Sequence, residues 1–171
     1  MYTLVRNLML SLLAALVFST PLHAEVAQAR IISVIDGDTV KVRDLGGMKY
    51  LVSLSGVDAP EIAQVKGRAA KDYLCSVICG KDVTIDSNKL NIDGHVLAVV
   101  YLDNTDVNQV MLEGGMAWQD MDDKGVLSSQ HYRSYAHAES VARRQGAGLW
   151  KDNMVVAPWR FREISQAALF D

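Results

Sequence analysis

The sequence lacks several features that would assign it to a class at once. It has only two cysteines among 171 residues and no Cys/His spacing of the metal-binding type, which excludes a zinc site built on such ligands. It shows no internal repeat and no low-complexity segment, so a repeat architecture is also excluded. About half of the residues are hydrophobic, which is enough for one domain with a core at this length. We therefore expect a single domain.

An excess of basic residues is also missing. The chain has 17 Lys and Arg against 20 Asp and Glu, a net charge of −3 at pH 7. Proteins that bind the phosphate backbone without sequence preference usually do so through a basic face, because counterion release supplies the affinity. An acidic average can still contain a basic cleft. The charge therefore argues against nucleic-acid binding without excluding it.

The sequence has no apolar run long enough to cross a membrane. The run at residues 8–18 is shorter than the ~20 residues that a spanning helix needs. It follows Arg6 and precedes Pro21 and the ending Leu22-His23-Ala24, the arrangement of a secretory signal peptide, although Leu22 is larger than the residue usual at that position. We expect residues 1–24 to be removed and the mature protein to be periplasmic or secreted, with no stable membrane span. The alternative, a membrane anchor, is disfavoured by the length of the run.

Hydrophobic periodicity predicts an α+β domain. Five strands are expected, with residues 29–43 forming two strands or one strand bent at 36–38, followed by strands at 50–57, 81–86 and 96–102. Helices are expected at 66–78, 107–112 and 129–144. Because the helices interleave with the strands or trail them, the pattern favours α+β over a parallel α/β sheet. Residues 152–171 are expected to be an extended tail that can end in a helix.

The two cysteines lie near the end of the first predicted helix. Cys75 and Cys79 are four residues apart, on one helix face and about 6 Å from each other. They can form a disulfide in an oxidising compartment if the helix end deforms near Gly80, or remain two small buried hydrophobic side chains. Both alternatives stay open at this stage.

Acidic residues gather at the ends of predicted strands. Asp36 and Asp38 flank a glycine, and Asp58 and Glu61 enclose an Ala-Pro pair after the strand expected to lie beside them. Carboxylates brought together repel one another unless a cation lies between them, and their hard oxygens favour Ca²⁺ or Mg²⁺. Asp-Gly and Asp-Ala-Pro are also favoured turn sequences. The residues alone leave a metal site and ordinary turns as alternatives.

The order of these two acidic segments resembles a known family. Residues 34–40, Val-Ile-Asp-Gly-Asp-Thr-Val, followed by residues 54–61, Leu-Ser-Gly-Val-Asp-Ala-Pro-Glu, are similar to the paired signature of the staphylococcal-nuclease-like (thermonuclease) family. The likeness continues through 115–118 and 148–150 and reaches 158–162. The resemblance implies a five-stranded OB-fold β-barrel with three helices over residues 25–151, followed by a tail at 152–171.

The resemblance also implies calcium-dependent hydrolysis of phosphodiester bonds in DNA or RNA. Asp38, Asp58 and the backbone carbonyl of Ala59 would hold Ca²⁺, and Glu61 would orient or deprotonate the attacking water. Asp36 is expected to stabilise its turn through backbone hydrogen bonds. The metal-binding half of the family site is complete in this sequence.

The phosphate-binding half departs from the family. Two family arginines correspond to Ser53 and His95 here, and neither serine nor neutral histidine offers the planar fork of a guanidinium. Losing one such donor costs on the order of a hundredfold to a thousandfold in rate. Lys49, Lys66 and Arg68 are candidate substitutes. Histidine is cationic only in mild acid, so a rescue by His95 predicts activity that rises as the pH falls toward about 6.

These departures leave more than one function open. At residues 119–123, Gln-Asp-Met-Asp-Asp stands where relatives tend to carry aromatic residues that stack on bases. We interpret the segment as a solvated loop, with a second calcium site as the alternative. The protein is expected to be a monomer that is either a weakened exported nuclease acting on single-stranded DNA or RNA, or a non-enzymatic module with a protein or nucleic-acid partner. A third class, a scaffold without a ligand, would make the acidic residues simple turn residues.

Overall fold

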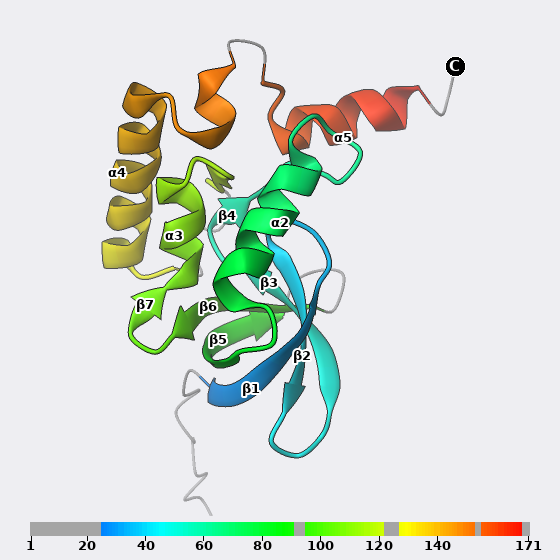
Figure 1. Ribbon diagram of the computed structural model, residues 1–171, viewed down its shortest axis with the longest axis vertical. Coiled ribbons are helices and arrows are strands. Elements are labelled where there is room, and N and C mark those ends of the chain that lie inside the picture. The colour runs from blue at the N-terminus through cyan, green and yellow to red at the C-terminus, as the bar shows by residue number, and fades with distance from the viewer. Residues whose placement is uncertain (1–24, 91–94, 122–126, 153–154, 169–171) are drawn as a thin grey trace, which may run out of the picture.

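The computed structural model describes residues 25–90, 95–121, 127–152 and 155–168 and builds them around a closed barrel (Figure 1). The barrel strands are β1 (Glu25–Val34), β2 (Thr39–Asp44), β3 (Lys49–Leu54), β5 (Asp82–Leu90) and β6 (Val96–Leu102). They lie in the order β3-β2-β1-β5-β6, with antiparallel neighbours, and the parallel pairing of β3 with β6 closes the sheet. The predicted α+β fold with a five-stranded OB-type barrel is confirmed.

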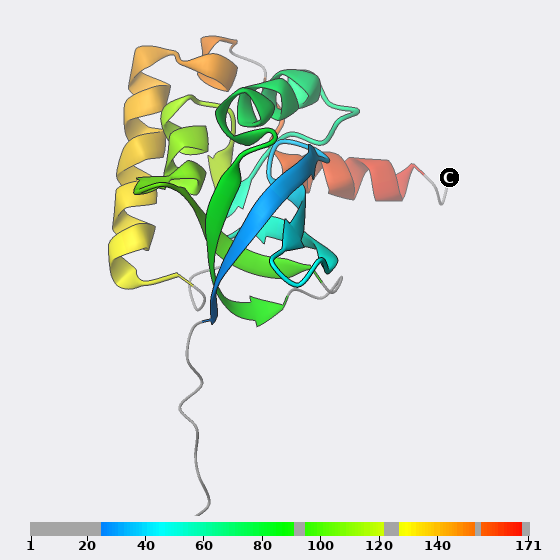
Figure 2. The same ribbon diagram turned by 60° about the horizontal axis from the view of Figure 1, so that its bottom comes forward.

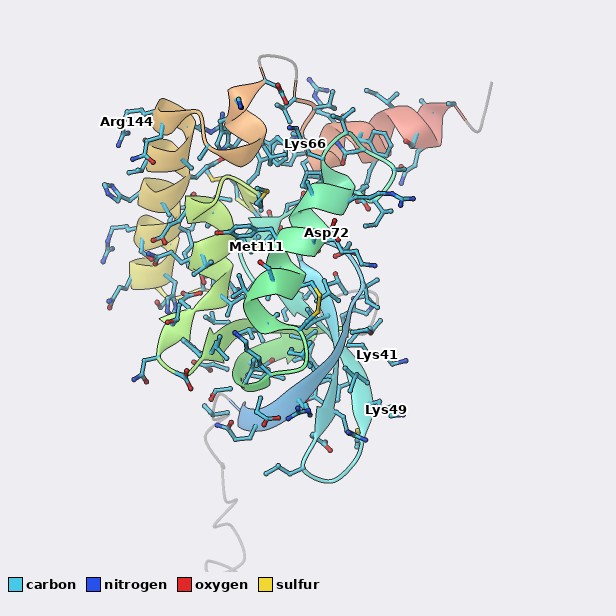
Figure 3. The ribbon with its side chains drawn as sticks, in the orientation of Figure 1. Lys41, Lys49, Lys66, Asp72, Met111 and Arg144 are labelled. Carbon is cyan, nitrogen blue, oxygen red and sulfur yellow. A yellow bond between two sulfur atoms is a disulfide. The ribbon has the colours of Figure 1, made fainter. Side chains whose placement is uncertain are left out.

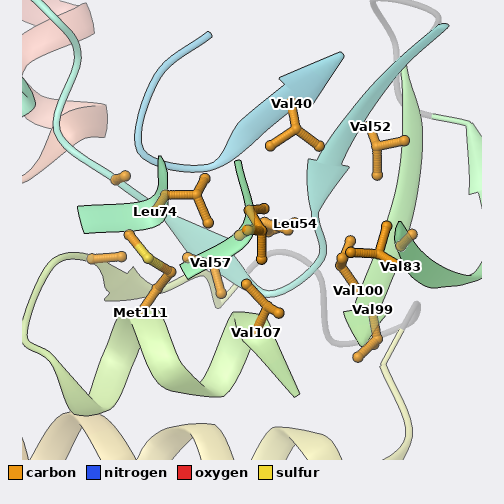
Figure 4. Close-up of a cluster of buried hydrophobic side chains, with 14 of the residues drawn as sticks. Val40, Val52, Leu54, Val57, Leu74, Val83, Val99, Val100, Val107 and Met111 are labelled. Carbon is orange, nitrogen blue, oxygen red and sulfur yellow. The ribbon is translucent and has the colours of Figure 1, made fainter. Parts of the chain in front are cut away.

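The barrel forms because its strands alternate between buried and exposed side chains. In β2, Val40 and Val42 are buried while Lys41 and Arg43 are exposed. Successive strand residues point to opposite faces, so a period of two places one apolar row inside the barrel. Figure 4 shows this interior, where Leu54 lies with valines from several strands.

Three helices continue the core beyond the barrel: α2 (Gly67–Ile78), α3 (Val107–Glu113) and α4 (Ser129–Gln145). In α2 the buried side chains Ala70, Leu74 and Ile78 recur every four residues, which gives one apolar face. Leu74 of α2 and Met111 of α3 belong to the same buried cluster as the barrel interior (Figure 4). The predicted helix bounds agree with these to within one residue.

The C-terminal segment is more structured than a mainly extended tail. After the short 3-10 helix η2 (Gly148–Lys151), residues 158–167 form a fourth α-helix in the described part of the chain, α5 (Pro158–Ala167). Proline at the first helical position favours this start, because its fixed φ suits the helix and its missing N–H has no intrahelical partner there. Figure 2 shows α5 projecting from the side of the barrel.

The remaining differences concern short or polar strands. Strand β1 begins at Glu25 and β5 extends to Leu90, beyond the predicted 29 and 86, because their backbones pair where the side chains are not alternately apolar. Two-residue strands also occur: β4 (Val57–Asp58) pairs with β8 (Trp118–Gln119), and β7 (Thr105–Asp106) pairs with β6. Backbone pairing of this length leaves little signal in hydrophobic periodicity.

The two cysteines form a disulfide. Cys75 lies in the last turn of α2, and Cys79 is the residue that ends the helix, with an extended backbone at ψ 127°. Of the two alternatives, the structure therefore shows the disulfide, which forms where the regular helix ends at Cys79. In the described residues, none of the helices combines the length and apolarity needed to span a bilayer. The predicted signal peptide at 1–24 lies outside the described residues.

Candidate functional site

The two acidic segments meet at one end of the barrel. Residues 35–38 connect β1 to β2, and Asp36 Oδ1 accepts hydrogen bonds from the N–H groups of Asp38 (3.0 Å) and Thr39 (2.7 Å). The predicted turn role of Asp36 is confirmed. Asp38 Oδ2 accepts a hydrogen bond of 2.6 Å from the N–H of Ala59. One carboxylate therefore joins the two segments directly.

Two glycines allow this close approach. A Cβ atom at Gly37 would lie 2.6 Å from Cβ of Ala59 and 2.8 Å from Cβ of Ala70 in α2. A Cβ atom at Gly67, the first residue of α2, would overlap the carbonyl oxygen of Glu61. The start of α2 is thus packed against the loop that carries the acidic residues, and a larger side chain at either glycine would push that loop away.

The buried carboxylates are held in an unfavourable electrostatic environment. Burial raises the pKa of Asp38 well above its usual range, and the nearby charges of Asp36 and Asp58 raise it further. Burial also raises the pKa of Asp58, although its hydrogen bonds with Arg162 oppose that change. Such a site gains stability when a cation approaches its oxygen atoms.

In this structure the approaching cation is a guanidinium. Arg162 of α5 donates from Nη2 to Asp58 Oδ2 (2.8 Å) and from Nη1 to Asp58 Oδ1 (3.1 Å), a two-pronged contact. Its Nη1 also donates to Glu61 Oε1 at 2.9 Å. The hydrogen bonds with Asp58 raise the pKa of Arg162 above its ordinary value. Arg162 therefore binds both Asp58 and Glu61.

Sequence reasoning did not identify Arg162 as a partner of these acids. Its candidate cations included Lys49, Lys66 and Arg68, and within the described chain none of these forms an ion pair with Asp58 or Glu61. Figure 3 shows Lys49 at the hairpin end of the barrel, far from Lys66, which instead pairs with Asp152 at 3.2 Å. Arg68 is exposed on α2. The available signal was the match of residues 158–162 to the family pattern.

The two residues expected at the family's arginine positions lie side by side. Ser53 Oγ of β3 is 3.1 Å from Nδ1 of His95, the residue before β6. Ser53 Oγ is also 3.5 Å from Thr39 Oγ1, which donates to Asp38 Oδ1 at 3.1 Å. The structure thus connects both positions to the acidic site through short polar side chains. Residues 91–94, which complete the corresponding segment, lie outside the described residues.

The donor set suits a hard divalent cation in its chemistry but not in its present contacts. Asp38, Asp58 and the carbonyl of Ala59 would offer the oxygen ligands that calcium prefers. Both oxygens of Asp58 already bind Arg162, and the described residues contain no group of three or more acidic, histidine or cysteine residues arranged to hold a metal. A cation at Asp58 would therefore meet the positive charge of Arg162.

The acidic segment at 119–123 is only partly described. Gln119 is buried and donates from Nε2 to the carbonyl of Tyr132 at 2.9 Å, while the N–H of Asp120 donates to the carbonyl of Gly56 at 2.9 Å. The first part of the segment is therefore anchored to the fold. Asp122 and Asp123, on which the alternative of a second calcium site depends, lie outside the described residues.

Comparison with known proteins connects this geometry to a family. A family model described as staphylococcal nuclease homologue matches residues 51–152. The chain belongs to the staphylococcal nuclease family. The match includes Asp58 and Glu61 together with Ser53 and His95, the two residues that the sequence led us to expect at the family's arginine positions. Its fold class and its relation to nucleases are thereby confirmed.

Several bacterial relatives align with most of the chain. A protein of Escherichia coli named uncharacterized endonuclease is 33% identical over 153 residues, covering 88% of this chain and 94% of its own length. A protein of the same name from Haemophilus influenzae is 30% identical, with 91% and 85% covered. A micrococcal nuclease of Shigella flexneri is 30% identical over 162 residues, with 90% of each chain covered. These relatives support an endonuclease-type enzyme, and the family suggests a nucleic-acid substrate.

Proposed function

We propose that this protein is a slow, exported nuclease that hydrolyses phosphodiester bonds of single-stranded DNA or RNA at the site formed by Asp38, Asp58 and Glu61. The observation that carries the proposal is the hydrogen bond between Asp38 and the N–H of Ala59, which brings the two acidic segments of a nuclease family together. Export is supported by the signal-peptide pattern of residues 1–24.

Each acidic residue has a proposed task. Glu61 is 39% exposed at its side chain, so water can reach it, and it would accept a proton from the attacking water. Asp38 and Asp58, with the carbonyl of Ala59, would hold the Ca²⁺ that the family generally uses. The ion would supply the positive charge that stabilises the phosphate during hydrolysis.

The reaction is proposed to be slow because no arginine stands at the two phosphate-binding positions. Ser53 carries no charge, and its hydroxyl is hydrogen bonded with His95. Arg162 binds Asp58 and Glu61 and is therefore not free to hold a phosphate in this structure. Each missing guanidinium costs on the order of a hundredfold to a thousandfold in rate, and two effects in one site are not additive.

A non-enzymatic binding module is the second candidate. It is favoured by the contact of Arg162 with Glu61, the proposed base, because a guanidinium there competes with the attacking water for the carboxylate. Such a module would keep the barrel and recognise a protein or a nucleic acid through another surface. The two candidates differ in whether the acidic site turns over at all.

The test is cleavage of single-stranded DNA and RNA by the purified protein with and without calcium. Glu61→Gln serves as the loss control, and the double substitution Ser53→Arg/His95→Arg restores the arginines. Slow cleavage that Glu61→Gln abolishes and the double substitution accelerates supports the nuclease. No cleavage by the native protein or by the double variant, at saturating calcium and with both folded, supports the binding module.

A further inference from the structure

We propose that Arg162 and a divalent cation compete for the same carboxylates, so that cation binding releases helix α5 from the acidic site. This competition rests on the cation site of the proposed function and belongs to the resting protein, whether or not the protein cleaves nucleic acid. It follows from the contacts of Arg162, from the way α5 is attached, and from the cleft beside it.

Arg162 contacts both oxygens of Asp58. The side chain of Asp58 is 12% exposed, and each of its two oxygens accepts a hydrogen bond from a different guanidinium nitrogen. Charge-assisted pairs with this forked geometry are the strong class of hydrogen bond. Each oxygen keeps a second lone pair, but a divalent cation bound there would lie next to the positive charge of the guanidinium at a mostly buried carboxylate. Arg162 and the cation therefore compete for Asp58.

Helix α5 is fastened mainly at its beginning. Among the described residues of the helix only Pro158 is buried, and Ile164, six positions further on, is 63% exposed. The base is held by Trp159, whose ring meets Trp118 edge to face with centroids 6.3 Å apart. The segment before the helix is tied down by a hydrogen bond from Gln64 Nε2 to the carbonyl of Val156 at 3.0 Å.

Beyond this base, the hydrogen bonds and ion pairs that join α5 to the acidic loop in the described residues are those of Arg162. A cleft of about 410 Å³ separates the helix from the loop, and its lining includes Glu61, Ile62 and Ala63 on one side and Phe161, Arg162 and Ser165 on the other. An open cleft supplies little packing energy, because apolar side chains stabilise only where they exclude water. When Arg162 loses its carboxylates, the middle of the helix therefore loses its main attachment.

Competition of this kind is reciprocal. If Arg162 weakens cation binding by a given factor, the cation weakens the attachment of α5 by the same factor. Arg162 is 46% exposed at its side chain, so solvent reduces the strength of the pair. A coupling in the lower part of the usual range, about tenfold, is expected. The coupling is measurable from both the cation and the helix.

The first measurement is calcium affinity, determined by isothermal titration calorimetry on the purified protein without nucleic acid. Arg162→Gln should bind calcium about tenfold more tightly than the native chain, and Arg162→Lys, which keeps the charge but loses the fork, should fall between them. Arg160→Gln is the matched control, since Arg160 lies on the same helix and, among the described residues, forms its ion pair with exposed Glu163 at 3.2 Å. Its affinity should equal that of the native protein.

The second measurement is hydrogen exchange of residues 158–167. Calcium should speed exchange in the native protein and in Arg160→Gln, whereas in Arg162→Gln the helix should exchange fast with or without calcium. Protection of the barrel strands verifies that each variant is folded, and Arg162→Lys takes over if Arg162→Gln is not. Equal calcium affinity in native and Arg162→Gln protein, no calcium binding by either, or exchange in α5 that ignores calcium would each overturn the proposal.

Discussion

Asn108 offers a direct test of how the barrel positions the acidic loop. It is fully buried at the start of α3, and its Nδ2 donates to the carbonyls of Ser55 and Ala98, both at 3.0 Å. Its Oδ1 accepts from the N–H of Val100 at 3.1 Å. One side chain thus binds the residue that begins the acidic loop and two residues of β6. We predict that Asn108→Ala destabilises the protein more than an ordinary core substitution of similar size.

The magnitude follows from the groups left behind. The carbonyl of Ala98 keeps a hydrogen bond from the N–H of Ser55 at 2.8 Å, so its loss is partial. The carbonyl of Ser55 and the N–H of Val100 lose their Asn108 partner in a buried environment, at about 1–3 kcal/mol each. Because the effects share one site they are not additive, and the total should be about 3–5 kcal/mol.

Urea denaturation followed by circular dichroism measures this loss as a change in the free energy of unfolding. The matched control is Gln109→Ala at the neighbouring position, whose side chain donates to Glu113 on the exposed side of α3. That variant should stay within about 0.5 kcal/mol of the native protein. A loss below about 1 kcal/mol for Asn108→Ala, with the control unchanged, would refute the assignment of Asn108 as a buried tie.

Three further predictions concern other parts of the fold. Burial raises the pKa of Asp106, although hydrogen bonds from the Gln109 N–H and the Tyr135 hydroxyl oppose that change. The native state therefore keeps a proton on Asp106 at pH values somewhat above 3.8, the usual pKa, where the unfolded state has lost it. Stability should therefore fall as the pH rises through that raised pKa, and Asp106→Asn should flatten the slope in urea unfolding measured from about pH 4 to 7; equal slopes would contradict this. Gly67→Ala should cost about 1–3 kcal/mol in the same assay because its Cβ meets the carbonyl of Glu61, and an unchanged free energy would contradict that contact. The disulfide closes a loop with a sequence separation of 4, so its reduction should lower the free energy of unfolding by about 2 kcal/mol. Thermal unfolding with and without reductant measures this loss. A loss above about 4 kcal/mol would show that the bond does more than close this loop.

The elements that the sequence predicted best are those whose side chains report their own environment. Strand β6 lies at the predicted residues 96–102, and α2 begins one residue after its predicted start. Both carry apolar residues at the period of their structure, and period is a local property of the chain. The ends of β1 and β5 were underestimated because their pairing is made by backbone groups with polar side chains attached. Periodicity does not register such pairing.

The same distinction between local pattern and distant contact applies to the residues of the site. The meeting of the two acidic segments was predicted because both carry a family signature and flank strands that pair. Arg162 was missed because it reaches Asp58 from 104 positions away along the chain. No pattern within a helix or a strand indicates which loop a distant arginine will contact. The resemblance of residues 158–162 to the family pattern drew attention to the segment, but it did not indicate its place in space.

Arg162 lies at a different place from Ser53 and His95, the two residues expected at the family's arginine positions. Those two residues lie on β3 and beside β6 and reach the acidic site through Thr39 and Asp38. Arg162 approaches from α5 and binds Asp58 and Glu61 themselves. Under the proposed function, a guanidinium at the first place would face the phosphate, whereas Arg162 neutralises the groups proposed to bind the cation and activate water. The same charge would then promote hydrolysis at one side of the site and oppose it at the other.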